Sequence, residues 1–94
     1  MTQNNITTTE ELLEFPCQFN LKVMGFNDPE LVNEICAIIS AHSKDFDPQG
    51  NITTRPSSSG KYIAVTAMMY AESKAQLDLI YQALHNHPLI KMTL

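Results

Sequence analysis

Hydrophobic and polar residues alternate along residues 17–24 and again along residues 61–70. A period of two is typical of strands that bury one face and expose the other. Residues 52–56 (ITTRP) form a shorter strand-like segment whose proline suggests an edge position, and residues 89–94 (LIKMTL) form a last one. The side chains predicted to point inward are Cys17, Phe19, Leu21 and Val23 in the first strand, Ile63, Val65, Ala67 and Met69 in the third, and Ile90, Met92 and Leu94 in the fourth.

The segment after the first strand follows the helical period instead. Residues 29–42 carry apolar residues three and four positions apart, and Asp28 followed by Pro29 is typical of a helix start. We therefore expect Gly25 to end the strand and Asp28 to cap the helix. The apolar stripe consists of Leu31, Ile35, Ile38 and Ile39, widened by Val32 and Cys36.

A second helix is predicted after the third strand. Ser73 stands three residues before Gln76, the spacing of a capping box, and Asn86 and Pro88 end the pattern. Its buried stripe consists of Leu77, Ile80, Tyr81 and Leu84.

The order of elements is βαββαβ, which predicts an α+β, ferredoxin-like sandwich with a four-stranded antiparallel sheet and both helices on one face. The sheet keeps an open face on the other side, which must meet water or another protein. Residues 11–94 form the single domain, and residues 1–10 are expected to be a flexible tail. Thr8 and Glu11 have capping-box spacing, so residues 9–14 are predicted to form one helical turn.

The net charge of -4 limits the kinds of partner that the protein is expected to bind. It argues against nucleic acid and against an anionic membrane surface, both of which need a concentrated basic face. The N-terminal residues have neither the basic nor the apolar region of a signal peptide. With Cys17 and Cys36 as two reduced, inward-facing thiols, we expect a cytoplasmic protein.

The stretch RPSSSGKY, residues 55–62, offers two interpretations. It lacks the first glycine of a phosphate-binding P-loop and is followed by a strand, so the P-loop interpretation fails. Nor does GKYIAV fit the aromatic motif of RNA-binding domains with this fold. The structural interpretation is a hairpin turn with Gly60 at positive φ. The alternative is an anion or partner site made of Arg55, Ser57, Ser58, Ser59 and Lys61.

The open face carries a group of methionine and tyrosine residues. The candidate contact residues are Lys22, Met24, Tyr62, Met68, Tyr70 and Lys91, with Thr66 and Leu89 beside them. Such a group is often a contact surface. Two alternatives stay open: the face is covered by Leu12, Leu13 and Phe15 of the chain's own N-terminal segment, or it is a surface for self-association.

The sequence predicts no catalytic or metal site and no cofactor. His85 and His87 are two residues apart at a helix end, which fits the helix dipole better than metal binding. The carboxylates lie in segments expected to be solvated, so we expect no acid–base catalysis and no enzyme.

Three blocks, LLEFPCQFNLKVMG, RPSSSGKY and LIKMTL, resemble in order and spacing the YbeD family of small bacterial proteins, over about residues 11–94. The resemblance implies a ferredoxin-like fold similar to ACT-type regulatory domains, and a lipoate-linked regulatory role. It carries over no active site.

A more distant resemblance connects VMGFNDPELVNEICAII to the ACT domain, in which a strand, a glycine turn and a helix hold an amino acid, usually at a dimer interface. By this resemblance the candidate ligand turn consists of Gly25, Asn27 and Asp28. Glu30 stands where the ACT pattern has glycine, and its bulk and negative charge oppose a carboxylate ligand.

Two functional hypotheses follow. The preferred one is a non-enzymatic binding or regulatory module that contacts a protein partner, or a second copy in a homodimer, through its open face. The second is an ACT-like sensor of an amino acid or a related small-molecule metabolite.

Overall fold

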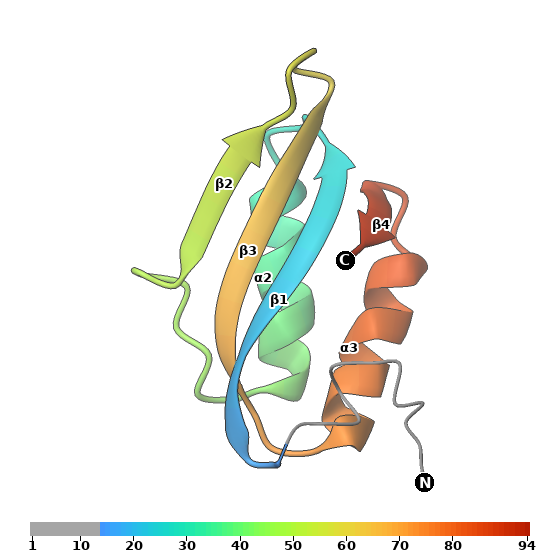
Figure 1. The fold of residues 1–94 in the computed structure, drawn as a ribbon. Coiled ribbons are helices and arrows are strands. Elements are labelled where there is room, and N and C mark those ends of the chain that lie inside the picture. Colours follow the sequence, from blue (N-terminus) through green and yellow to red (C-terminus); the bar gives the residue numbers. More distant parts are fainter. Residues whose placement is uncertain (1–13) are drawn as a thin grey trace, which may run out of the picture.

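The structure, a computed structural model, describes residues 14–94 (Figure 1). The elements are β1 (Cys17–Phe26), α2 (Leu31–His42), β2 (Ile52–Pro56), β3 (Tyr62–Ala71), α3 (Lys74–His85) and β4 (Ile90–Thr93), in the predicted βαββαβ order. The tail expected at 1–10 and, apart from Glu14, the helical turn expected at 9–14 lie outside the described residues.

The strands form one antiparallel sheet in the order β2-β3-β1-β4, so β2 is an edge strand as predicted. β1 and β3 pair along their whole lengths, from Cys17 opposite Ala71 to Phe26 opposite Tyr62. Gly25 therefore does not end β1, contrary to the prediction. A Cβ at Gly25 would lie 2.7 Å from the main-chain carbonyl oxygen of Leu89, so the glycine allows close packing within the strand.

Both helices cover the same face of the sheet, as Figure 1 shows. Between the two layers lies one core, whose buried residues are Leu21, Val23, Leu31, Ile35, Ile39, Val65, Ala67, Met69, Ala71, Leu77, Ile80 and Leu84. The inward-facing set predicted for β1 and β3 is confirmed except for Cys17, which is not part of the core. Phe19 and Ile63 are partly buried at the margin of this core. Among residues 14–94, neither helix is long and apolar enough to cross a membrane.

The start of α2 differs from the prediction. The helix begins at Leu31, and Glu30 occupies the N-cap without a side-chain hydrogen bond. Asp28 acts earlier: its carboxylate accepts the N–H of Glu30 at 2.8 Å, and its carbonyl accepts the N–H of Leu31 at 3.0 Å. The predicted cap position is wrong because Asp followed by Pro also favours a tight turn, which here precedes the helix.

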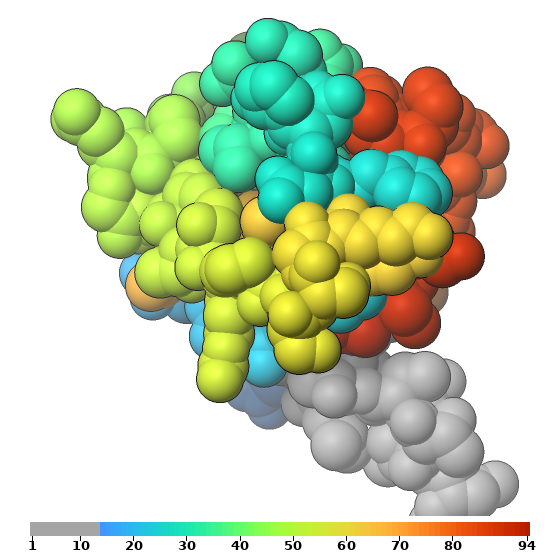
Figure 2. All heavy atoms as spheres, turned by 90° about the horizontal axis from the view of Figure 1, so that it is seen from above, coloured from blue at the N-terminus to red at the C-terminus, as the bar shows by residue number. Residues whose placement is uncertain are grey.

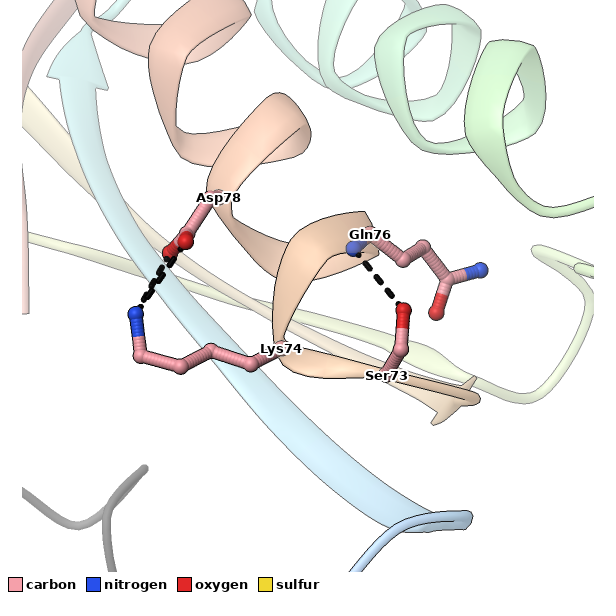
Figure 3. A network of polar contacts seen from close by, with 4 residues as sticks. All are labelled: Ser73, Lys74, Gln76 and Asp78. Carbon is pink, nitrogen blue, oxygen red and sulfur yellow. Dashed lines mark hydrogen bonds and ion pairs between the residues drawn. The ribbon is translucent and has the colours of Figure 1, made fainter.

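The start of α3 follows the prediction more closely (Figure 3). The Ser73 hydroxyl accepts the N–H of Gln76 at 3.1 Å, which is half of a capping box. The other half is displaced by one residue, because the Gln76 side-chain oxygen accepts the N–H of Glu72, at 2.7 Å. Lys74 and Asp78 form an exposed ion pair of 3.1 Å on the next turn.

A β-bulge in β4 reverses part of the predicted inward pattern. Met92 pairs with Met24 and Ile90 pairs with Gly25, so Lys91 is the extra residue between them. Ile90 consequently packs against the core, as predicted, whereas Met92 faces away from the helices and is 47% exposed. Strict alternation is wrong here because the bulge breaks the period of two.

The two leucines that flank β4 also lie on the opposite sides from those predicted. Leu94, expected inside, is 62% exposed. Leu89, expected on the open face, is partly buried against the core, in the turn that leads from α3 back to the sheet.

Candidate functional site

The open face is formed by alternate residues of the strands, on the side that the helices leave uncovered. Pairing and alternation place on it Gln18, Asn20, Lys22, Met24 and Phe26 of β1, Thr53 and Arg55 of β2, Tyr62, Ala64, Thr66, Met68 and Tyr70 of β3, and Met92 of β4. Five of the six predicted contact residues lie there. The sixth, Lys91, is an exposed bulge residue.

Exposed apolar side chains on the open face lie on both β3 and β4. Met68 is 38% and Tyr70 is 51% exposed near the end of β3, and Met92 is exposed opposite Met24 on the β4 side. Exposed, connected methionine and tyrosine side chains can adapt to a partner surface and bury much apolar area. Their exposure shows that the described part of the chain does not cover them.

The open face is also hollowed and basic. A groove of about 410 Å³ is lined by residues that include Lys22, Thr53, Arg55, Ala64, Thr66 and Leu94. Its floor is low because Ala64 and Thr66 are short side chains between longer ones. The open-face positions of β1, β2 and β3 include Lys22 and Arg55 but no Asp or Glu, although the protein has ten acidic and six basic residues.

An aromatic pair lies at one end of the open face. The rings of Phe26 and Tyr62, which pair across β1 and β3, have centroids 5.6 Å apart and are tilted by 41°. The Lys61 ammonium lies 5.6 Å from the centroid of the Tyr62 ring. Lys61 thus adds a cation to this end of the sheet.

The serine stretch is the β2–β3 hairpin turn. Gly60 has a φ of +76°, and its N–H donates to the Ser57 carbonyl at 2.9 Å. The Ser57 hydroxyl accepts the N–H of Tyr62, and the Ser59 hydroxyl accepts that of Lys61, both at 3.2 Å. The Ser57 and Ser59 hydroxyls thus help to hold the turn, and the Ser58 and Ser59 side chains are exposed.

The two cations of the candidate anion site have different neighbours. Arg55 lies in β2 opposite Ala64 and lines the groove, whereas Lys61 contacts the Tyr62 ring. The structure therefore assigns Arg55 to the open face and Lys61 to its end.

The candidate ligand turn packs against the hairpin turn, as Figure 2 shows for the yellow and cyan segments. The N–H of Asn27 donates to the Lys61 carbonyl at 3.0 Å, and the Asn27 side chain donates to the Gly60 carbonyl at 2.8 Å. Every main-chain N–H from Phe26 to Leu31 donates within the protein, Pro29 having none. The space above Gly25 is filled by Leu31. The main-chain N–H groups that would bind a ligand in an ACT domain are thus already hydrogen-bonded within this protein.

His85 and His87 each lie within hydrogen-bonding distance of a different side chain. His87 Nδ1 accepts the N–H of Leu89 at 3.1 Å, so its Nε2–H points to the Glu34 carboxylate 3.0 Å away. His85 Nε2 lies 2.9 Å from the Thr93 hydroxyl. Glu34, expected to be solvated, is therefore partly buried beside His87. Within residues 14–94 no group of three His, Cys, Asp or Glu side chains could hold a metal.

Cys17 and Cys36 were predicted to be core residues, but both are free thiols that are only partly buried. Burial raises the pKa of the Cys36 thiol above its ordinary value. A raised pKa lowers the thiolate fraction and so the reactivity of this residue.

The sequence reasoning missed Phe26, Met92 and Leu94 as exposed residues on this side of the sheet. Phe26 could have been found by extending the alternation of β1 past Gly25. Met92 and Leu94 could not, because no residue type in LIKMTL marks the bulge.

The order of elements, the sheet and the one-sided helices define a ferredoxin-like α+β sandwich. The solution structure of protein HP0495 from H. pylori has the same fold, with a TM-score of 0.71, 13% sequence identity and 98% of each chain covered. At this identity the likeness concerns the fold alone.

The chain belongs to the family described as Protein of unknown function (DUF493), which matches residues 10–94. A UPF0250 protein of Neisseria gonorrhoeae is 43% identical over 94 residues, covering 100% of both chains. A UPF0250 protein of Nitrosomonas europaea is 38% identical over 87 residues, covering 93% of this chain and 99% of the other. The predicted membership of the YbeD family is confirmed.

Proposed function

We propose that this protein is a non-enzymatic binding or regulatory module that contacts another protein, or a second copy of itself, through its open face. The observation that carries the proposal is the exposure of Met68, Tyr70 and Met92 on the side of the sheet without helices. Burying such side chains against a partner removes apolar area from water, at about 25 cal/mol for each Å². We place this activity in the cytoplasm, where the free thiols of Cys17 and Cys36 stay reduced.

The geometry favours this role over the ACT-like sensor. The turn at Gly25, Asn27 and Asp28 holds the hairpin turn and the start of α2 together, as described above. A small-molecule ligand there would have to displace these hydrogen bonds. The open face offers exposed side chains without such a cost.

One alternative is that the chain's own N-terminal segment covers the open face, and the position of Phe15 bears on it. Phe15, one of the three residues considered as an internal cover, packs against the buried core instead. Leu12 and Leu13 lie outside the described residues. Phe15 therefore contributes to the helix side of the protein.

The test compares association in matched variants. Met68→Lys and Tyr70→Lys, singly and together, place charge on the open face, and Leu79→Lys places the same charge on α3, where Leu79 is 50% exposed. Mass is measured by light scattering, and partner capture from native cytoplasm is quantified for each variant.

We expect the double variant to lose a partner, or the dimer, that wild type and Leu79→Lys both retain. A protein that stays monomeric and captures the same partners in all variants would contradict the proposal. The identity of the captured partner also tests the lipoate-linked role that the family resemblance implies.

A further inference from the structure

β2 lies at the edge of the sheet (Figure 1). One row of its main-chain groups therefore faces away from the other strands. Its pairing with β3 fixes which row this is. Ser57 N–H donates to the Tyr62 carbonyl and Met68 N–H donates to the Asn51 carbonyl, both at 2.9 Å. Residues 51 and 57 thus direct their main-chain groups to β3. The direction of the main-chain N–H and C=O groups alternates along a strand. The main-chain groups of residues 53 and 55 therefore also point to β3, whereas those of residues 52, 54 and 56 point away from the sheet.

The outward row consists of the N–H and C=O groups of Ile52 and Thr54 and the C=O of Pro56, which has no N–H. Within residues 14–94 neither outward N–H has a hydrogen-bond partner. Such a row is a template for an added strand. Pro56 limits the template to about five residues, because an added strand finds no donor there.

The open face beside this edge carries two basic side chains. Arg55 on β2 and Lys22 on β1 line the groove, and among residues 14–94 neither side chain forms an ion pair. The open-face positions of β1, β2 and β3 hold no carboxylate side chain, in a protein of net charge -4. Carboxylates of a partner would be complementary to these two cations.

We propose that β2 receives an extended, acidic segment of a partner protein as a fifth, antiparallel strand. This inference rests on the proposed function and specifies the partner's chemistry. The residue opposite Thr54 would exchange both main-chain hydrogen bonds with it and point its side chain toward the helix side. Its two neighbours would then point to the open face, where an acidic side chain lies beside Arg55 on the adjacent strand. Lys22, two strands further on, adds positive charge to the groove without direct contact. The segment therefore alternates apolar and acidic residues.

Two other occupants fit less well. A second copy joined through β2 would bring Arg55 of both copies to one face without a carboxylate, over an edge of five residues. A standard interface buries about 800 Å² on each partner, more than so short an edge supplies. A single-stranded nucleic acid would use the tyrosines and cations but not the outward N–H groups.

The probe is the end-capped peptide Ser-Val-Glu-Val-Glu-Val-Ser, whose pattern reads alike in both directions. Binding is followed by NMR on the whole chain. We expect the amides of Ile52 and Thr54 to become protected from hydrogen exchange by about tenfold or more. The amides of Thr53 and Arg55, already bonded to β3, should change little.

Modified peptides and variants test each part. N-methylation of the three valines should abolish binding, N-methylation of the two glutamates should not, and a peptide with lysine for glutamate should not bind. Arg55→Glu should weaken binding at least tenfold. Thr54→Pro should abolish binding with the urea midpoint unchanged, whereas Thr53→Pro should lower that midpoint, because only the Thr53 N–H serves the sheet.

The proposal is overturned if the peptide does not bind at millimolar concentration, if it leaves the Ile52 and Thr54 amides unprotected, or if N-methyl glutamate rather than N-methyl valine blocks it. Tighter binding of a single-stranded oligonucleotide to the same residues would also overturn it. If the peptide fails while Met68→Lys and Tyr70→Lys still abolish association, only this inference is rejected and the proposed function stands.

Discussion

Met68 and Met69 are consecutive residues of β3 that lie on opposite faces of the sheet. Met69 is 3% exposed beneath the helices, whereas Met68 is 38% exposed on the open face. The same side chain thus has two roles, set only by the alternation of the strand. On the helix side it stabilises the fold; on the open side it is available to a partner.

The polar groups of the turns and those of the open face also differ. At the end of the sheet, Ser57, Asn27 and Asp28 use their hydrogen-bonding groups within the chain. On the open face Lys22 and Arg55 form no ion pair within residues 14–94. The first set of polar groups stabilises the fold, whereas the two exposed cations beside exposed apolar residues are available to a partner.

The largest expected effect on stability is that of shortening Met69, with Met68 as its matched control. Met69→Ala removes a buried side chain and leaves a cavity, so we expect a loss of about 2–5 kcal/mol in the free energy of unfolding. Met68→Ala should change it by about 0.5 kcal/mol or less. Urea unfolding of both variants measures the difference. Similar losses in both would contradict the assignment of the two faces.

Gly25→Ala tests the close approach between β1 and the turn before β4. The new Cβ would meet the Leu31 side chain and the Leu89 carbonyl, and main chain cannot easily move aside. We expect a loss of up to about 3 kcal/mol. Gly50→Ala is the control, because φ is +78° there but nothing lies within 4 Å. It should cost only about 1–2 kcal/mol of backbone strain, and a Gly25→Ala variant as stable as wild type would contradict the packing described here.

Ser73→Ala removes the hydroxyl that caps α3 and should cost about 1 kcal/mol. Ser58→Ala, at an exposed position of the hairpin turn, should stay within about 0.5 kcal/mol of wild type. Thermal unfolding of the two variants side by side provides the measurement. Equal midpoints would show that the cap contributes nothing to the helix layer.

The smallest effect concerns Cys36, at the margin of the helix layer. Because burial raises its pKa in the folded protein, the folded state holds the thiol proton more tightly. This contribution to stability is fully present below about pH 8.5, the ordinary thiol range, and is lost as the pH rises through the raised pKa. In a Cys17→Ser variant, iodoacetamide should modify Cys36 more slowly at pH 8 when the protein is folded than in urea. Equal rates would place the thiol in open solvent.

Periodicity predicted most of the fold because the buried residues repeat with it. Leu21, Val23 and Val65 follow the strand period, and Leu77 and Leu84 follow the helix period, so each pattern had one structural solution. Most of the open face follows from the same alternation, since fixing the inward residues fixes the outward ones.

The errors occurred where a local main-chain event broke the period. The bulge at Lys91 exposed Met92, and the turn at Asp28 moved the start of α2 to Leu31. The outward row of β2 was also beyond prediction, because Ile52 and Thr54 acquire free N–H groups only through the register with β3. That register is a tertiary property that no short segment encodes.

The measurement that tests the central claim most directly is a methionine-oxidation footprint of the free protein and of its complex or dimer isolated from native cells. With dilute hydrogen peroxide, Met68 and Met92 of the free protein should oxidise roughly tenfold faster than Met69. In the complex the oxidation of Met68 should slow toward that of Met69. A Met68 that oxidises equally fast in both states would contradict the claim that the open face is where this protein meets its partner.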